Sequence, residues 1–185
     1  MKQRMLVLFS HGKESGPQGS KIRALMRVAV QMGAATLSVN YREYPDGTVH
    51  DQNAQGEAER RVSQLLNTPL PNHDLLVLVG SSMGGYVSTL ATISLKVDGL
   101  FLLAPAFYIP GYVNQAPESK AQTTTVVHGW HDDVVPFANS LRFCVQSSSE
   151  LHLLSGDHRL NAVLPKIEPL FAQFLQDIYQ PETDE

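Results

Sequence analysis

The sequence predicts an α/β fold, a three-layer α/β/α sandwich in which helices cover both faces of a mostly parallel six-stranded sheet. Three observations lead to this prediction. The chain has 185 residues, 43% of them hydrophobic, which is enough for one domain with a sizeable core and too few for two. Six short apolar runs recur along it, and segments with helical periodicity separate them. Such alternation is typical of a parallel sheet covered on both faces.

The six apolar runs are the candidate strands. Most of them are continuous rather than alternating, which indicates burial on both faces of a parallel sheet. In chain order they are residues 5–9, 36–39, 75–79, 100–104, 125–127 and 151–154. Ligands of such sheets bind at the carboxyl ends of the strands. The residues that directly follow each run are therefore the first in which to search for function.

The helices are predicted from apolar residues at spacings of three and four. This periodicity marks helices around residues 22–30 and 58–66 and a last helix over 164–178. Ser20 is available as an N-cap of the first helix, and Gly33 is a stop signal after it. Either Pro165 or Pro169 starts or kinks the last helix.

We expect residues 1–180 to form a single domain and the acidic residues 181–185 to form a frayed tail. Residues 105–121 contain several aromatic side chains, lack periodicity and are longer than an ordinary connection. Two interpretations of this segment stay open. It covers or lines a ligand site, or it is a surface loop with aromatic anchors.

Charge and composition exclude several classes of function. The formal net charge is −4 and basic residues form no cluster, so we expect neither nucleic acid nor a membrane surface as a partner. Cys144 is the single cysteine, which excludes an intramolecular disulfide and a thiolate zinc site. The apolar run near the N-terminus is too short for a signal segment or a membrane span. We expect a soluble, cytoplasmic protein without a cofactor.

Small residues stand where the run 75–79 gives way to a helix that begins near Met83. The segment Gly80-Ser81-Ser82-Met83-Gly84 fits the pattern Gly-x-Ser-x-Gly with Ser82 at its centre. A serine in this position occupies a sharp, strained turn, and small residues on both sides let strand and helix approach. The pattern alone is weakly specific. A serine nucleophile also needs a base and an orienting acid.

Candidates for that acid and base follow two later strands. Asp132 lies shortly after the run 125–127, and His158 lies shortly after the run 151–154. Because parallel strands end at the same edge of a sheet, we expect Ser82, Asp132 and His158 on one rim. Their order in the chain is also that of hydrolases built on this turn. The sequence therefore predicts a constellation suited to acyl transfer.

With these residues the sequence resembles compact members of the α/β-hydrolase superfamily, in particular small bacterial esterase-like proteins. The segments that carry the resemblance are Ser10-His11-Gly12, Gly80-Ser81-Ser82-Met83-Gly84, Gly129-Trp130-His131-Asp132 with Val135-Pro136, and Gly156-Asp157-His158. The resemblance spans nearly the whole chain. It implies a minimal α/β-hydrolase fold with strand order 2-1-3-4-5-6, without the early antiparallel strands and the inserted cap domain of larger members.

The resemblance also implies roles for individual residues. Ser82 is then the nucleophile, His158 the general base and acid, and Asp132 the carboxylate that holds the imidazole. The N–H groups of Met83 and Lys13 form the implied oxyanion hole. The expected substrate pocket includes His11, Gly12, Phe107, Tyr108 and Tyr112. The expected substrate is a small-molecule carboxylic ester or thioester; an acyltransferase, a peptidase and a non-catalytic ligand-binding protein stay open as alternatives.

Several neighbouring residues have competing interpretations. Asp133 competes with Asp132 for the role of the acid and otherwise caps its loop. His128 and His131 suggest a metal site, but two imidazoles three residues apart at a strand end diverge, so we expect no metal. For His11 and His128 we favour structural hydrogen bonds over chemistry.

Other polar and aromatic residues are assigned packing roles. Cys144 is expected to pack within a helix, and His152 is expected to be an ordinary strand residue. We expect Tyr41 and Tyr44 to pack a turn rather than to bind substrate.

Overall fold

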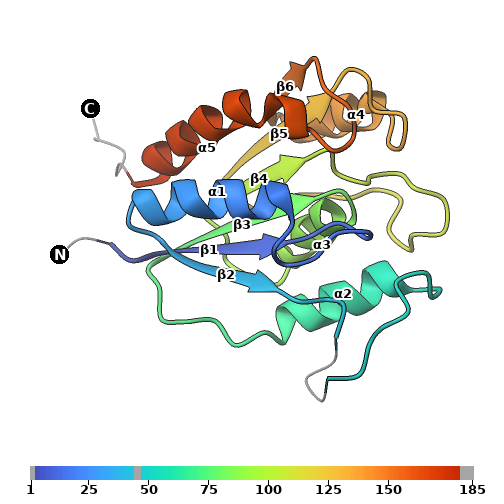
Figure 1. Ribbon diagram of the computed structural model, residues 1–185, viewed down its shortest axis with the longest axis horizontal. Coiled ribbons are helices and arrows are strands. Elements are labelled where there is room, and N and C mark those ends of the chain that lie inside the picture. The colour runs from blue at the N-terminus through green and yellow to red at the C-terminus, as the bar shows by residue number, and fades with distance from the viewer. Residues whose placement is uncertain (1–2, 44–46, 180–185) are drawn as a thin grey trace.

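The computed structural model describes residues 3–43 and 47–179, and it contains a six-stranded sheet with helices on both faces (Figure 1). The strands are β1 (Met5–Ser10), β2 (Ala35–Val39), β3 (Leu75–Ser81), β4 (Gly99–Leu103), β5 (Thr123–Gly129) and β6 (Glu150–Leu154). Every pairing within this sheet is parallel, and the strand order is β2-β1-β3-β4-β5-β6. The predicted strands and their order are confirmed. The sheet is wholly parallel rather than mostly so.

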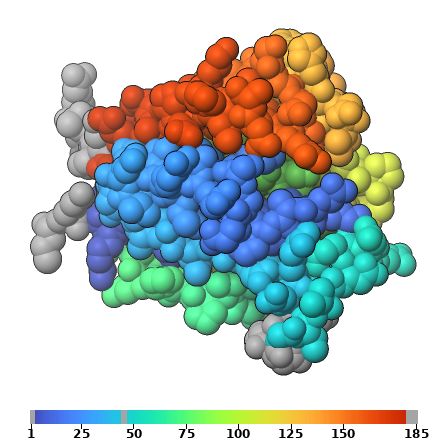
Figure 2. All heavy atoms as spheres, in the orientation of Figure 1, coloured from blue at the N-terminus to red at the C-terminus, as the bar shows by residue number. Residues whose placement is uncertain are grey.

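The helices form the two outer layers of the predicted sandwich. They are α1 (Ser20–Gln31), α2 (Glu57–Leu66), α3 (Met83–Ala91), α4 (Phe137–Ser147) and α5 (Leu164–Tyr179), with a 3₁₀ turn, η1 (Asn161–Val163), before α5. Helices α1 and α5 cover one face of the sheet, where Figure 2 shows them side by side. Helices α2, α3 and α4 cover the other face. The predicted three-layer arrangement is therefore confirmed.

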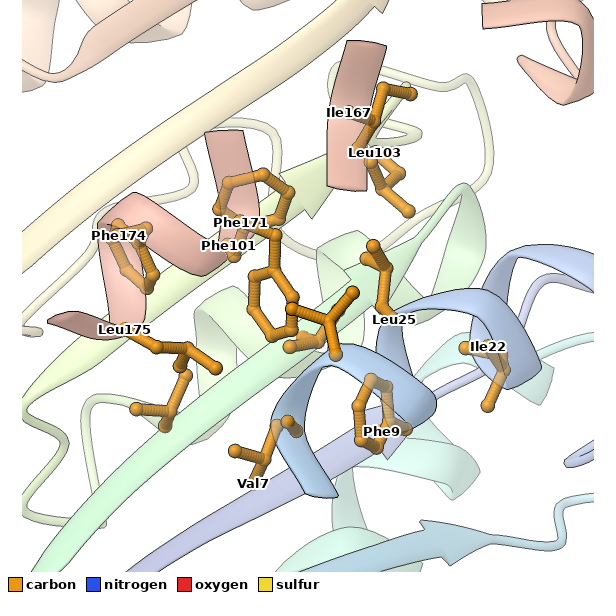
Figure 3. Close-up of a cluster of buried hydrophobic side chains, with 14 of the residues drawn as sticks. Val7, Phe9, Ile22, Leu25, Phe101, Leu103, Ile167, Phe171, Phe174 and Leu175 are labelled. Atoms are coloured by element: carbon orange, nitrogen blue, oxygen red, sulfur yellow. The ribbon is translucent and has the colours of Figure 1, made fainter. Parts of the chain in front are cut away.

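The burial pattern of the strands explains their sequence. Strands β1 and β4 are buried at every position, and β3 at all but its first, because they lie inside the sheet between two helical layers. Under α1 and α5, Phe101 of β4 contacts Phe171 and Phe174, with ring centroids 5.0 and 5.3 Å apart (Figure 3). The edge strands β2 and β6 remain partly exposed. Continuous apolar runs are thus found where both faces are covered.

The ends of the helices follow simple backbone rules. Gly33 adopts a φ of +86° just after α1, as expected of a residue that stops a helix. The prediction that Ser20 caps α1 is wrong, because Gly19 occupies the cap position and the Ser20 hydroxyl donates to Asn161 Oδ1 at 2.8 Å. Pro165 lies in the first turn of α5, where a missing N–H costs nothing, and the helix continues through Pro169.

Some expectations fall outside the described residues, namely Tyr44 and the tail 181–185. Within the described part of the chain, no helix has both the length and the apolar character needed to cross a bilayer. The long connection between β4 and β5 carries no helix or strand, as its lack of periodicity predicts.

Candidate active site

Ser82 is the single residue between strand β3 and helix α3. Its backbone φ of +54° and ψ of −121° lie in a region that residues other than glycine rarely adopt. The surrounding backbone holds this conformation. The Ser82 N–H donates to the Leu103 carbonyl at 3.0 Å, and the Ser82 carbonyl accepts from the N–H groups of Gly85 and Ala106 at 2.9 and 3.0 Å. The turn is therefore fixed by the end of β4 and by the segment that follows it.

Glycines make this turn sterically possible. A Cβ atom on Gly80 would lie 2.4 Å from the Gly84 carbonyl oxygen, and one on Gly84 would lie 2.1 Å from the Ser10 carbonyl oxygen. A Cβ on Gly85 would lie 2.8 Å from Pro105 Cβ. Because backbone atoms cannot move away cheaply, a larger residue at Gly80 or Gly84 would push α3 away from β3 and β1. The glycine spacing in the sequence reflects this close approach.

The structure brings Ser82, His158 and Asp132 into one hydrogen-bonded chain. His158 Nε2 lies 3.0 Å from Ser82 Oγ, and His158 Nδ1 lies 2.7 Å from Asp132 Oδ2. An ionised carboxylate only accepts hydrogen bonds, so the proton of the neutral ring is on Nδ1. Nε2 is then free to accept the hydroxyl proton of Ser82. The side chain of Asp132 is 0% exposed and that of His158 is 17% exposed, so solvent reaches the imidazole but not the carboxylate.

The Asp132 carboxylate is held by four donors. Oδ1 accepts from the N–H groups of Val134 and Val135 at 2.9 and 2.8 Å, and Oδ2 accepts from His158 and from His128 Nε2, which lies 2.9 Å away. Burial alone would raise the pKa of the Asp132 carboxyl, but these hydrogen bonds outweigh it and hold the pKa well below its usual range. Asp132 is therefore ionised and cannot readily take a proton from His158.

Asp133, the alternative acid, and His128 and His131, the two candidate metal ligands, lie in different environments. Asp133 is exposed, and the carboxylate that accepts the hydrogen bond from His158 Nδ1 is that of Asp132. His131 is exposed, whereas the His128 ring is buried behind Asp132. Among the residues that the structure describes, no group of three or more histidine, cysteine, aspartate or glutamate side chains could hold a metal ion.

His11 supports the loop after β1 and does not face an open pocket. Its side chain is fully buried, its Nδ1 donates to the Gly12 carbonyl at 2.7 Å, and its Nε2 accepts from the Tyr41 N–H at 3.2 Å. Burial lowers the pKa of His11 to about 4, so the ring is neutral at pH 7. The expected contact between the His11 side chain and a substrate is therefore not available in this conformation.

The loop that follows His11 lies beside Ser82. A Cβ atom on Gly12 would lie 3.3 Å from Ser82 Cβ, so the backbone there passes close to the serine. The guanidinium of Arg61, fully buried in α2, donates to the His11 carbonyl at 3.1 Å and to Glu57 at 2.6 Å. Helix α2 therefore fixes the loop in place.

The two proposed oxyanion donors belong to elements that meet at Ser82. Met83 is the first residue of α3, where N–H groups have no acceptor within the helix and the helix dipole favours negative charge. Lys13 directly follows Gly12 in the loop after β1. Their use as an oxyanion hole stays a prediction.

The aromatic residues expected in the pocket pack mainly against α3 and α4. Phe107 is fully buried, with its ring centroid 4.4 Å from that of Phe143, so it has no surface to offer a substrate. The Tyr108 hydroxyl donates to Gln146 Oε1 at 3.0 Å, and the Arg142 guanidinium lies 4.0 Å from the centre of the Tyr108 ring. Both tyrosine contacts are with α4.

Tyr112 anchors the far part of the same segment. Its ring centroid lies 4.6 Å from that of Tyr86 in α3, and burial raises the pKa of Tyr112 to about 12. The Tyr86 hydroxyl donates to Glu59 at 3.2 Å and accepts from the Asn114 N–H at 3.1 Å, while the Val113 N–H donates to Glu59 at 2.9 Å. Residues 105–121 are therefore tethered by aromatic anchors, and they begin next to Ser82.

Two side chains near the site were not predicted to act there. His128 places a second imidazole on Asp132, where the sequence predicts only a structural hydrogen bond. Lys21 of α1 donates from Nζ to the His158 carbonyl at 3.3 Å, and burial lowers the pKa of its ammonium to about 8. The sequence does contain a sign that Lys21 points inward, because its spacing places it on the same helical face as the buried residues Leu25 and Val28.

No family model and no curated protein sequence matches the chain. Among solved structures, a protein from Xanthomonas campestris pv. campestris assigned to the hydrolases of the alpha/beta superfamily is 27% identical, with a TM-score of 0.77 over 95% of this chain and 99% of that chain.

Two further structures share the fold at lower identity. Est1E from Butyrivibrio proteoclasticus, solved with bound ferulic acid, has a TM-score of 0.78 and 17% identity over 96% of this chain and 90% of its own. An alpha-beta serine hydrolase homologue from Coxiella burnetii has a TM-score of 0.70 and 21% identity over 92% and 84%.

The wholly parallel sheet in the order β2-β1-β3-β4-β5-β6, with helices on both faces, is an α/β-hydrolase fold. The similarity to the Xanthomonas campestris protein supports the resemblance to the α/β-hydrolase superfamily that the sequence indicates.

Proposed function

We propose that this protein is a serine hydrolase that cleaves a small carboxylic ester or thioester through an acyl-enzyme on Ser82. The observation that carries the proposal is the hydrogen-bonded chain from Ser82 Oγ through the His158 ring to Asp132 Oδ2, with distances of 3.0 and 2.7 Å. An alcohol, an imidazole and a carboxylate connected in this order form a catalytic triad. The strained turn at Ser82 acts as the nucleophile elbow that presents the hydroxyl.

In the first half of the reaction, Ser82 Oγ attacks the carbonyl carbon of the substrate while its proton passes to His158 Nε2. Asp132 stabilises the resulting imidazolium and stays ionised, because its four donors favour the anion. The bond to the leaving alcohol or thiol then breaks, and the leaving group takes the proton from Nε2. In the second half, water attacks the acyl-enzyme, His158 takes its proton, and the proton returns to Ser82 as the acid departs.

The oxyanion of each tetrahedral intermediate is bound by the N–H groups of Met83 and Lys13. The position of Met83 at the start of α3 supports its assignment, because this N–H and the helix dipole both favour negative charge beside Ser82. The close approach of Gly12 to Ser82 supports the assignment of Lys13. Each donor of this kind typically contributes about 10²–10³-fold in rate.

An ester or thioester is favoured as the substrate because the described connections at this rim carry no inserted helix or strand apart from the short 3₁₀ turn η1. Nothing on the described chain resembles a separate cap that could grip a peptide on both sides of its scissile bond. The Est1E structure holds ferulic acid, and a carboxylic acid is the kind of product that this proposal expects.

The test compares the variants Ser82→Ala and Ser81→Ala. We expect the wild-type protein to hydrolyse p-nitrophenyl acetate and to react with a fluorophosphonate probe, and we expect Ser82→Ala to lose both properties. Ser81 is the matched control, because it is the adjacent serine at the end of β3 and is buried. Labelling retained by Ser82→Ala would rule out the proposed nucleophile. Esters of graded acyl length would then define the substrate range.

A further inference from the structure

We propose that His128 is a positioning residue that shares the Asp132 carboxylate with His158 and thereby sets how strongly Asp132 supports the His158 imidazolium. This inference rests on the proposed function. It concerns the second donor on Asp132 Oδ2, which the triad by itself does not require. His128 contacts neither the substrate nor the reacting atoms, and it acts through Asp132.

The contacts of His128 Nε2 determine where the ring carries its proton. Nε2 lies 2.9 Å from Asp132 Oδ2 and 3.0 Å from the Val135 carbonyl oxygen. The ionised carboxylate and the carbonyl can only accept hydrogen bonds. Nε2 must therefore carry a proton, which it shares between these two acceptors.

The other side of the ring is held by helix α4. His128 Nδ1 lies 2.7 Å from the Oγ atom of Ser140, and both side chains are fully buried. In the neutral ring, Nδ1 accepts the Ser140 hydroxyl proton. The ring is therefore fixed between α4 and the loop after β5, and its Nε2–H points at Asp132 without freedom to turn away.

The result is a chain of five groups with Asp132 at its centre. On each side, an imidazole connects the same carboxylate oxygen, Oδ2, to a serine hydroxyl. The two ends differ in access, because Ser82 is partly exposed and Ser140 is fully buried. Only the half that contains His158 and Ser82 can meet a substrate. The other half can act only by changing what Asp132 offers to His158.

The physical effect of His128 follows from the sharing of one oxygen. A hydrogen bond to Oδ2 from His128 withdraws negative charge from the atom that stabilises the His158 imidazolium. Removing that donor leaves more charge for His158, so the imidazolium persists to higher pH. The orientation of the carboxylate should survive, because Oδ1 keeps its hydrogen bonds from Val134 and Val135.

Other charged groups near the His158 ring and Asp132 stay unchanged in this comparison. They are Lys21 from α1, Asp157 and Arg159 from the loop that carries His158, and the exposed His131 and Asp133 from the loop after β5. The contribution of Ser140 from α4 is a neutral hydrogen bond. A change in pH dependence on replacing His128 can thus be assigned to the lost N–H donor.

The test measures kcat/KM for p-nitrophenyl acetate against pH in three variants. His128→Leu removes the donor, and we expect the pH of half-maximal kcat/KM to rise by about 0.5–1 unit. This shift is smaller than the full energy of one charge-assisted hydrogen bond, because only part of that energy is passed on to the His158 imidazolium. His128→Gln keeps an N–H of similar reach, and its midpoint should stay near that of the wild-type protein. His152→Gln is the matched control on β6, and its profile should be unchanged.

Two results would overturn the inference. One is a His128→Leu variant with the wild-type midpoint, and the other is a His128→Gln variant that shifts as far as His128→Leu. Either result would mean that the N–H group of His128 has no effect on His158 beyond filling space.

A second measurement needs neither activity nor a folded variant. In ¹⁵N-labelled wild-type protein, NMR spectra of the imidazoles should show His128 with its proton on Nε2 near pH 7. A proton on Nδ1 alone would contradict the inference. If the wild-type protein hydrolyses no ester, the proposed function fails, while the NMR result still decides whether His128 donates to Asp132.

Discussion

Replacing Asp132 with asparagine tests the hydrogen-bonded chain at its centre. Asparagine keeps the shape of the side chain and one carbonyl oxygen, which can still accept from the N–H groups of Val134 and Val135. The second oxygen becomes an NH₂ group, which donates to His158 Nδ1 instead of accepting from it. The His158 proton then moves to Nε2, and the ring can no longer accept the proton of Ser82.

The size of the effect follows from these contacts. A reversed tautomer in a triad costs about 10⁴-fold in kcat, equivalent to roughly 5 kcal/mol of transition-state stabilisation. The new NH₂ group also faces the buried Nε2–H of His128, and two opposed donors cost about 1–3 kcal/mol of folding stability. We therefore expect a folded variant with a lowered melting temperature and almost no turnover.

The assay is the steady-state hydrolysis of p-nitrophenyl acetate, with thermal unfolding measured on the same samples. Asp133→Asn is the matched control, because this neighbouring carboxyl is exposed and does not bond to His158 in the structure. We expect Asp133→Asn to keep a rate close to that of the wild-type protein. An Asp132→Asn variant that stays within tenfold of the wild-type rate, or an Asp133→Asn variant that loses as much activity, would show that Asp132 does not set the proton position on His158.

Three further predictions concern the support of the site. Gly84→Ala places a Cβ 2.1 Å from the backbone of β1, so urea unfolding should reveal a loss of about 3 kcal/mol or more, whereas Gly16→Ala, with its nearest atom at 3.9 Å, should change little. Burial lowers the pKa of His11 to about 4 from 6.5, so its stabilisation is complete above pH 6.5 and is lost as the pH falls toward 4. Denaturation curves measured at several pH values should show the free energy of unfolding falling by up to about 3 kcal/mol between pH 6.5 and 4. An equal dependence of the unfolding free energy on pH in His11→Gln would contradict this assignment to His11. Lys21→Met removes the donor to the His158 carbonyl, so kcat should fall about fivefold with KM unchanged. A larger change in KM than in kcat would mean that Lys21 binds substrate instead.

Much of the fold could be predicted from the sequence because strand burial has a direct signature. β1, β3 and β4 lie between two helical layers, so their residues are apolar at nearly every position. The turn at Ser82 was also visible, because the approach of α3 to β1 and β3 excludes any Cβ at Gly80 and Gly84. Parallel strands then brought Asp132 and His158 to the same rim. Their catalytic roles stay predictions.

The support of the site could not be predicted because it depends on contacts between distant elements. The bond between His128 and Ser140 requires the docking of α4 on β5, and spacing in the chain does not specify which ring nitrogen faces Asp132. The sequence predicts Phe107 in the pocket because it follows β4, but an aromatic residue in a loop can pack inward as readily as outward. It packs on Phe143.

The proposed acyl-enzyme on Ser82 can be detected by finding which side chain an acyl group attaches to. The protein is mixed briefly with p-nitrophenyl acetate, quenched in acid, digested and analysed by mass spectrometry. We expect an acetyl group on Ser82 that forms in the wild-type protein and is absent from His158→Ala quenched at the same time. An acetyl group found only on other side chains, or one that forms on Ser82 equally fast without the imidazole, would rule out Ser82 as a nucleophile activated by His158.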